Sequence, residues 1–152
     1  METPALQDPP LPASGVQPCR LYTDGASRGN PGEAGAGIVL QNDKGEELLT
    51  RSAYLGQMTN NAAEYHALIL GLDTALELGC TEIAIFLDSE LIVRQIQGDY
   101  KVKHQTLQPL FSRVRERLPR FTHWQIQHIP RTQNSRADKM ANQGIDSRQQ
   151  TG

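Results

Sequence analysis

Long hydrophobic runs are missing from this chain of 152 residues, and none approaches the roughly 18 apolar residues that cross a bilayer, so no membrane partner is expected. The first 18 residues have neither a basic start nor an apolar stretch, and we expect no secretory signal there. Cysteine is also scarce. Cys19 and Cys80 are too few for a disulfide framework, and a reducing, cytoplasmic setting is the default expectation.

Positive charge is in short supply over the chain as a whole, and it is unevenly distributed. Lys and Arg number 15 against 17 Asp and Glu, for a net charge of −2, which excludes a generally basic protein. Residues 19–88 contain four basic and ten acidic side chains, whereas residues 89–131 contain eight basic and three acidic ones. The second segment could face phosphate groups while the first gathers carboxylates, or these charges could simply form solvated helix faces.

The chain length fits one domain with short tails. Residues 1–18 contain five prolines and few large apolar side chains, so this segment cannot bury enough surface to fold and is predicted to be a disordered tail. Residues 147–152 are predicted to form a second disordered tail. The expected domain therefore covers residues 19–146.

Hydrophobic periodicity and turn residues predict an alternation of strands and helices. The expected strands cover residues 20–23, 35–40, 47–55, 82–87 and 122–129. The expected helices cover the stretch between residues 60 and 79, then residues 89–97, 106–118 and 136–145. Because three consecutive strands precede a strand and helix alternation, the order predicts an α/β fold with a mixed sheet covered by helices.

Four acidic side chains lie at the ends of these expected elements, namely Asp24, Glu64, Asp88 and Asp138. Ligands of open α/β sheets bind beyond the carboxyl ends of strands, so Asp24 and Asp88 come close together if their strands are neighbours. Taken singly, each residue also has a structural explanation. Glu64 and Asp138 favour a helix N-terminus electrostatically, and Asp88 could cap the helix that follows it.

Several carboxylates held together repel one another and stay ionised only if cations neutralise them. Oxygen ligands favour hard ions such as Mg²⁺, which binds a few carboxylates and keeps some of its water molecules. Two such ions about 4 Å apart can activate a water molecule and stabilise the leaving oxygen in phosphodiester hydrolysis. The four carboxylates together are therefore a candidate two-metal nuclease site.

Four short motifs surround these carboxylates. They are YTDGASRGNPG at 22–32, TNNAAE at 59–64, LDSEL at 87–91, and HIPR at 128–131 followed by Asn134, Ala137 and Asp138. They resemble the motifs of the type 1 ribonuclease H family, and the resemblance runs from about Arg20 to Asn142 with all four motifs in family order. Agreement over four separate motifs is a specific signal.

The resemblance implies a ribonuclease H-like fold, with five strands in the order 3-2-1-4-5 and strands 1–3 antiparallel. It implies an endonuclease that hydrolyses the RNA strand of RNA–DNA hybrids and leaves 5′-phosphate and 3′-hydroxyl ends. Asp24 would bridge two Mg²⁺ ions, with Mn²⁺ as a possible substitute. Glu64 and Asp88 would complete one metal site, and Asp138 would belong to the other. We expect the enzyme to act as a monomer.

A histidine and an arginine near the fourth motif are candidates for assisting proton transfer or product release. His128 lies ten residues before Asp138 and Asn134 lies four before it, spacings similar to those of the family's flexible-loop histidine and asparagine. A histidine with a near-neutral pKa can move a proton. Because a proline follows two residues later, His128 could instead be held at a strand end, and some relatives use an arginine, here Arg131, in this role.

Recognition of the RNA strand is expected from groups that can bond a 2′-hydroxyl. The candidate substrate-binding residues near the motifs are Gly25, Ser27, Asn30, Thr59, Asn60, Asn61, Arg131 and Asn134. An asparagine amide both donates and accepts hydrogen bonds, as a hydroxyl requires. Asn30 could instead be only a turn residue, and Asn60 only a helix cap.

The family often has a basic protrusion, an extra helix that grips the DNA strand. The segment between the second and third expected helices holds only Lys101, Lys103 and His104 as basic side chains, so we expect the protrusion to be absent. Lys101 and Lys103 remain candidate substrate contacts. Four arginines that could compensate in part are Arg94, Arg113, Arg115 and Arg117. Fewer phosphate contacts predict weaker binding and a shallower salt dependence.

Two rival interpretations stay open. The chain could be a non-catalytic hybrid-binding module, although that interpretation requires a missing carboxylate and none is missing. It could also be another nuclease of the same superfamily, such as a DNA exonuclease or a resolvase. The adjacent Asn60 and Asn61 favour recognition of a 2′-hydroxyl over this alternative.

Overall fold

The computed structural model describes residues 17–151, with side chains through residue 148, so most of the predicted N-terminal tail lies outside the described residues. The strands are β1 (Pro18–Gly29), β2 (Gly32–Asn42), β3 (Glu47–Met58), β4 (Glu82–Leu87) and β5 (His123–His128). The helices are α1 (Asn60–Glu77), α2 (Glu90–Gln97), α3 (Gln108–Arg117) and α4 (Ser135–Thr151), with short 3₁₀ turns at Leu118–Arg120 and Arg131–Gln133.

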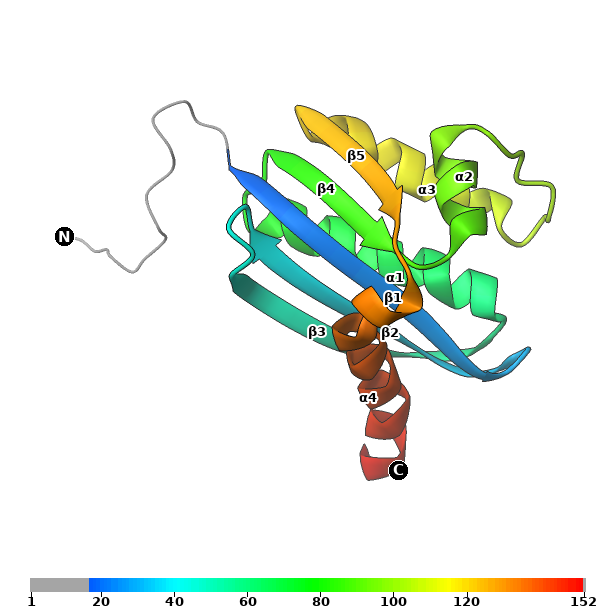
Figure 1. Cartoon of the computed structure of the whole chain (residues 1–152). Helices are drawn as coiled ribbons and strands as arrows, with labels where there is room; N and C mark the ends of the chain where they lie inside the picture. The colour runs from blue at the N-terminus through cyan, green and yellow to red at the C-terminus, as the bar shows by residue number, and fades with distance from the viewer. Residues whose placement is uncertain (1–16, 152) are drawn as a thin grey trace.

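The five strands form one mixed sheet in the order β3-β2-β1-β4-β5, which confirms the predicted fold class (Figure 1). β2 is antiparallel to both β1 and β3, whereas β4 is parallel to both β1 and β5. The last register pair between β1 and β4 joins Tyr22 to Phe86. Asp24 and Asp88 each follow this pair by two residues, so they lie at the same edge of the sheet.

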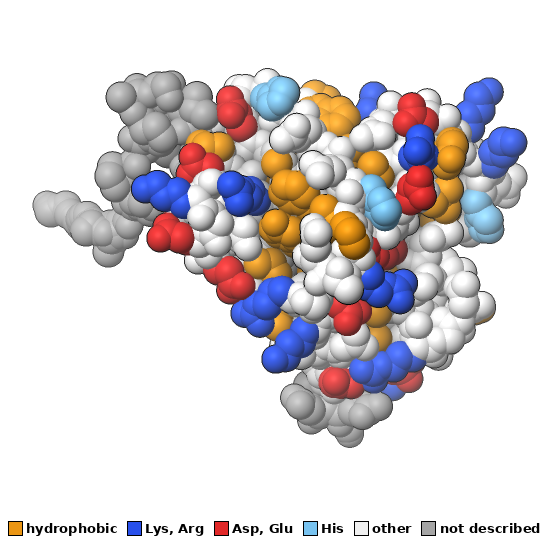
Figure 2. All heavy atoms as spheres, in the orientation of Figure 1, with side chains coloured by type: hydrophobic (Ala, Val, Ile, Leu, Met, Phe, Trp, Pro, Cys, Tyr) orange, Lys and Arg blue, Asp and Glu red, His pale blue; other side chains and the backbone are white. Residues whose placement is uncertain are grey.

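Helices cover the two faces of the sheet unequally (Figure 1). The main core lies between the sheet and α1, extends to α2 and α3, and buries side chains such as Leu21, Leu68 and Ile85. On the opposite face α4 packs on β1, β2 and β3 around Val39 and Met140. Figure 2 shows that apolar side chains remain visible on the part of this face that α4 leaves uncovered.

Local sequence signals set the ends of the helices that position the site. The Thr59 hydroxyl caps α1 by accepting a hydrogen bond from the N–H of Ala62 at 3.2 Å. Ser89 caps α2 in the same way, through the N–H of Ile92 at 3.3 Å. α2 ends at Gly98, whose φ of 91° lies in the left-handed region that favours glycine.

β1 and α4 extend furthest beyond their predicted ranges. β1 continues through Gly29, because the small and polar residues after Tyr22 pair with β2 rather than depending on their own hydrophobicity. α4 continues through Thr151, past the predicted end at residue 145, and includes residues 147–151 of the segment for which a disordered tail is predicted. Ion pairs of Arg28 with Asp146 at 2.8 Å and of Arg148 with Glu33 at 3.6 Å hold this extension to the β1–β2 hairpin.

The two cysteines also depart from the expectation. Cys19, at the start of β1, forms a disulfide with Cys80, which precedes β4. Parallel pairing of Pro18 with Glu82 brings these two segments together, a proximity that the separation of 61 residues conceals in the sequence. Pro18 belongs to β1, so the domain begins before residue 19. Among residues 17–151, no helix is long and apolar enough to cross a membrane.

Candidate active site

A close approach between β1 and α1 brings the first two carboxylates together. Asp24 lies on β1 opposite Gly37 and is only 6% exposed. The following residue, Gly25, packs against the α1 backbone, where a Cβ would lie 2.2 Å from the carbonyl carbon of Ala63. The Gly25 N–H donates a hydrogen bond to Glu64 Oε1 at 3.0 Å. The missing side chain at residue 25 therefore lets the start of α1 place Glu64 beside Asp24.

The other two carboxylates reach the same place from β4 and α4. Asp88 directly follows β4, and ligand oxygens of Asp24, Glu64 and Asp88 all lie within 4.8 Å of one another. Asp138, in the first turn of α4, is exposed and lies near enough to Asp24 for its charge to raise the Asp24 pKa. The structure thus brings all four predicted carboxylates to one end of β1 and β4.

The cluster brings several carboxyl groups together in a poorly hydrated position. Burial, followed by the nearby Glu64 and Asp88, raises the pKa of Asp24 to about 10. Burial also raises the pKa of Glu64 to about 8, and its hydrogen bond from Gly25 opposes part of that rise. Arg131 opposes it further through its positive charge. Without a cation, the fold disfavours ionisation of both carboxyl groups.

This donor set suits a hard divalent cation. Every candidate ligand is a carboxylate oxygen, and no histidine or cysteine belongs to the cluster found among the described residues. A bound cation would replace the protons that Asp24 and Glu64 otherwise require at neutral pH. The residues present therefore fit Mg²⁺ or Mn²⁺.

Asn134 departs from its predicted role. We expected it to contact substrate, but its side chain is only 1% exposed and offers almost no surface for such a contact. Its amide Nδ2 donates to the Thr23 carbonyl at 2.9 Å and to Asp88 Oδ2 at 3.0 Å. The motif spacing marked this residue, but the sequence contains no signal for these two partners.

The candidate RNA-contacting residues form a network at the tip of the β1–β2 hairpin. The Ser27 N–H donates to Asn60 Oδ1 at 3.0 Å, and the Asn60 N–H donates to Asn30 Oδ1 at 3.1 Å. These bonds use the amide oxygens, whereas the amide N–H groups of Asn30 and Asn60 bond to no group in residues 17–151. The exposed Thr59 and Asn61 lie beside them along a hollow of about 300 Å³ that His104 and Thr106 also line.

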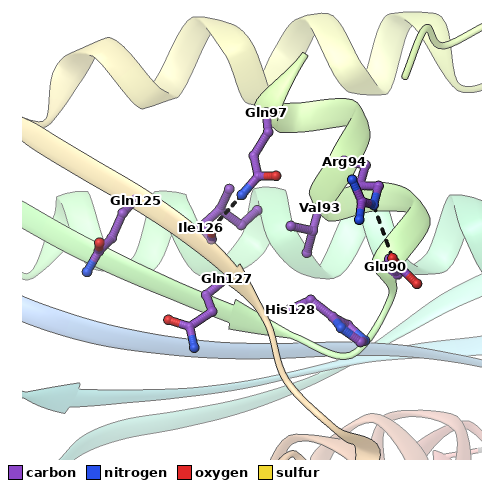
Figure 3. Close-up of a pocket in the computed structure, with 8 residues that line it drawn as sticks. All are labelled: Glu90, Val93, Arg94, Gln97, Gln125, Ile126, Gln127 and His128. Carbon is purple, nitrogen blue, oxygen red and sulfur yellow. Dashed lines mark hydrogen bonds and ion pairs between the residues drawn. The ribbon is translucent and has the colours of Figure 1, made fainter. Parts of the chain in front are cut away.

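His128 lies at the end of β5, paired in register with Leu87. Its exposed ring borders a cavity of about 310 Å³ between β5 and α2, opposite Glu90 and Arg94 (Figure 3). Arg94 and Glu90 form an ion pair at 3.0 Å across the first turns of α2. Arg131 lies three residues further on, in the 3₁₀ turn before α4. His128 therefore lies at a strand end, the alternative to a flexible loop.

The basic residues divide into two groups. Lys101 and Lys103 are exposed in the segment between α2 and α3, where no helix stands in for the protrusion. Arg115 instead donates to the Ile96 carbonyl at 3.1 Å, and Arg117 pairs with Asp73 at 2.6 Å. Arg115 and Arg117 already have partners within the domain. Fewer arginines are therefore free to contact a phosphate backbone in place of the missing protrusion than the sequence suggests.

Known proteins share this fold and much of this sequence. The family described as reverse transcriptase-like matches residues 22–144. Ribonuclease HI of Halobacterium salinarum is 41% identical over 136 residues, which cover 86% of this chain and 68% of that protein. The crystal structure of RNase H1 from the same archaeon has a TM-score of 0.84 at 40% identity and covers 86% of this chain and 98% of that one.

Two further likenesses concern an enzyme complex and a larger protein. The crystal structure of LC11-RNase H1 in complex with an RNA/DNA hybrid has a TM-score of 0.81 at 45% identity, covering 85% of this chain and 97% of that one. The bifunctional protein Rv2228c of Mycobacterium tuberculosis is 42% identical over 132 residues, and the chain spans 36% of its length. The sheet order and the acidic cluster define a ribonuclease H-like domain. The chain belongs to the type 1 ribonuclease H family.

Proposed function

We propose that this protein is a metal-dependent endonuclease that hydrolyses the RNA strand of RNA–DNA hybrids and leaves 5′-phosphate and 3′-hydroxyl ends. The observation that carries the proposal is the convergence of Asp24, Glu64 and Asp88, with ligand oxygens within 4.8 Å of one another. Family membership and a relative described in complex with an RNA/DNA hybrid support the same activity.

Asp24, Glu64, Asp88 and Asp138 would hold two Mg²⁺ ions, with Mn²⁺ as a possible substitute. When bound, such ions supply an activated water molecule and stabilise the oxygen that leaves the phosphorus. Asp24 would be the central ligand, because the charges of Glu64, Asp88 and Asp138 all act on its carboxyl group. Gly25 keeps Glu64 aligned through its N–H, so this ligand stays oriented when the charge of the site changes.

His128 and Arg131 are the candidates for moving a proton or helping the product leave. His128 is exposed at the end of β5. It is paired in register with Leu87, the residue directly before Asp88. Arg131 is close enough to influence the charge of Glu64. An imidazole can accept and return a proton near neutral pH, whereas a guanidinium can only donate hydrogen bonds to phosphate oxygens.

The asparagine network is the proposed reader of the RNA strand. Asn30 and Asn60 line a hollow at the start of α1 with their amide oxygens already bonded, and their amide N–H groups can bond to a 2′-hydroxyl. Ser27, Thr59 and Asn61 complete this surface, whereas Gly25, also predicted to bind substrate, is buried and its N–H is bonded to Glu64. Lys101 and Lys103 extend it with positive charge for a phosphate backbone. Action as a monomer in the cytoplasm stays a prediction of the sequence.

The deciding experiment is a cleavage assay on four labelled substrates: an RNA–DNA hybrid, single-stranded RNA, duplex RNA and duplex DNA. Each is incubated with Mg²⁺, Mn²⁺ or chelator, and with the wild-type protein or Asp24→Asn. We expect cleavage only of the RNA strand in the hybrid, dependent on metal and lost in Asp24→Asn. Hybrid binding without cleavage in either metal would identify a binding module, and cleavage of duplex DNA would identify another nuclease of the superfamily.

A further inference from the structure

Asn134 is a buried amide that connects three of the elements that supply carboxylates. Its Nδ2 donates to the Thr23 carbonyl at 2.9 Å, directly before Asp24, and to Asp88 Oδ2 at 3.0 Å. Its main-chain carbonyl accepts a hydrogen bond from the N–H of Asp138 at 3.0 Å. One residue thus contacts β1, the end of β4 and the first turn of α4.

We propose that Asn134 is a positioning residue whose side chain sets the spacing between Asp88 and the β1 segment that carries Asp24, for divalent cations. The proposal rests on the proposed function, because it assigns to Asn134 the alignment of that same site. Asn134 is only 1% exposed and therefore offers almost no surface to a substrate. It acts through the carboxylates that it holds.

The orientation of the Asn134 amide is fixed by its two partners. A backbone carbonyl and a carboxylate oxygen are both acceptors, so only the NH₂ side of the amide can face them. The bond to Asp88 Oδ2 restrains rotation of that carboxylate, leaving the remaining lone pairs of its two oxygens for the cluster. Groups that bond to a metal-binding carboxylate orient it in this way.

The other end of the amide shows that stability alone does not explain the residue. Asn134 Oδ1 is buried and has no hydrogen-bond partner among the described residues. A buried acceptor without a partner is unfavourable, and an apolar side chain of similar size would avoid that cost. The amide is therefore retained for its two donated bonds, both of which lead to the site.

The test replaces Asn134 and measures metal binding apart from catalysis. Asn134→Leu keeps much of the volume and removes both donors, and Asn134→Asp keeps the shape and places a carboxylate next to Asp88. The matched control is Gln95→Leu, which removes another buried amide. The Gln95 amide accepts a hydrogen bond from the Tyr65 hydroxyl at 2.5 Å and does not belong to the acidic cluster. Thermal stability of each protein is titrated with Mg²⁺ alone, and kcat and KM are measured on the hybrid.

We expect both Asn134 variants to require about 10–100 times more Mg²⁺ for half-maximal stabilisation. Their kcat should fall, while the KM for the hybrid should change less than about twofold, because the hybrid-contacting surface lies elsewhere. Gln95→Leu should lower the melting temperature without changing the Mg²⁺ midpoint. A folded Asn134→Leu or Asn134→Asp protein with the wild-type Mg²⁺ midpoint and kcat would overturn the proposal. If Asn134→Leu does not fold, Asn134→Asp decides alone.

The two proposals fail in distinguishable ways. If the wild-type protein does not cleave the hybrid, the proposed function is wrong, but the Mg²⁺ titration of thermal stability still reports whether Asn134 aligns the carboxylates. If the wild-type protein cleaves the hybrid and the Asn134 variants have unchanged Mg²⁺ midpoints, only the positioning role is wrong.

Discussion

Replacing Asp24 by asparagine should make the metal-free protein more stable while abolishing hydrolysis. Burial and the neighbouring carboxylates raise the pKa of Asp24 from 3.8 to about 10. The folded protein must therefore keep this group protonated at neutral pH, whereas the unfolded chain releases the proton. The stability that the protonated form contributes is fully present below about pH 4 and is lost as the pH rises towards 10. Asparagine is neutral at every pH and avoids that loss.

The size of the gain follows from the same two pKa values. Each pH unit above 3.8 costs the folded protein roughly 1.4 kcal/mol, so the cost is about 4 kcal/mol at pH 7 and about 2 kcal/mol at pH 5. Asp24→Asn should recover up to these amounts in the presence of chelator. For a protein of this length, the gain at pH 7 corresponds to a rise in melting temperature on the order of 10 °C.

The assay is urea unfolding in chelator at several pH values between 5 and 8, with Asp43→Asn as the control. Asp43 is an exposed carboxylate in the β2–β3 turn, so its replacement should change the free energy of unfolding little at any pH. Added Mg²⁺ should stabilise the wild type more than Asp24→Asn, because the variant lacks a central ligand. An Asp24→Asn protein that is less stable than the wild type, or a difference that does not grow with pH, would refute the reasoning.

Three further changes test other parts of the molecule. In Gly25→Ala the new Cβ would lie 2.2 Å from the Ala63 carbonyl carbon. This variant should therefore be less stable by about 1–3 kcal/mol or more in urea unfolding and should cleave the hybrid more slowly. Wild-type stability would contradict the close approach. Reduction of the Cys19–Cys80 disulfide should lower the free energy of unfolding by about 4 kcal/mol, given a separation of 61 residues, and an unchanged urea midpoint would count against a native disulfide. His128→Ala should lower kcat about 100-fold with little change in KM, whereas loss of kcat in Arg131→Ala alone would transfer the role to the arginine.

The sequence predicts the sheet well because its strands carry their own signals. The stretch 47–55 and the apolar run IAIFL before Asp88 are both predicted as strands from local patterns, and they form most of β3 and β4. The second half of β1 carries no such pattern. Its residues from Asp24 to Gly29 are small or polar, and they become a strand only because β2 pairs with them. The same holds for the end of α4, which distant ion pairs stabilise.

The candidate site shows the same division between local and distant information. The four carboxylates are predictable because each lies next to a recognisable element end, and parallel strands bring such ends together. The burial of Asn134 is not predictable, since its partners Thr23 and Asp88 lie 111 and 46 residues away. The ion pair of Arg117 with Asp73 is not predictable for the same reason, because the two residues lie far apart in the sequence. Charge along the sequence identifies a basic side chain but not whether a partner already neutralises it.

The contacts that assemble the acidic cluster come largely from uncharged groups. A glycine N–H holds Glu64, an asparagine amide holds Asp88, and a main-chain carbonyl anchors the N–H of Asp138. These groups keep their hydrogen-bonding capacity at any pH, so they hold the carboxylates together even though the carboxylates repel one another. The repulsion is therefore built into the fold and is relieved either by protons or by cations. Metal affinity and folding stability consequently depend on the same free energy. A change that weakens the repulsion should raise the folding stability of the metal-free protein and lower its metal affinity.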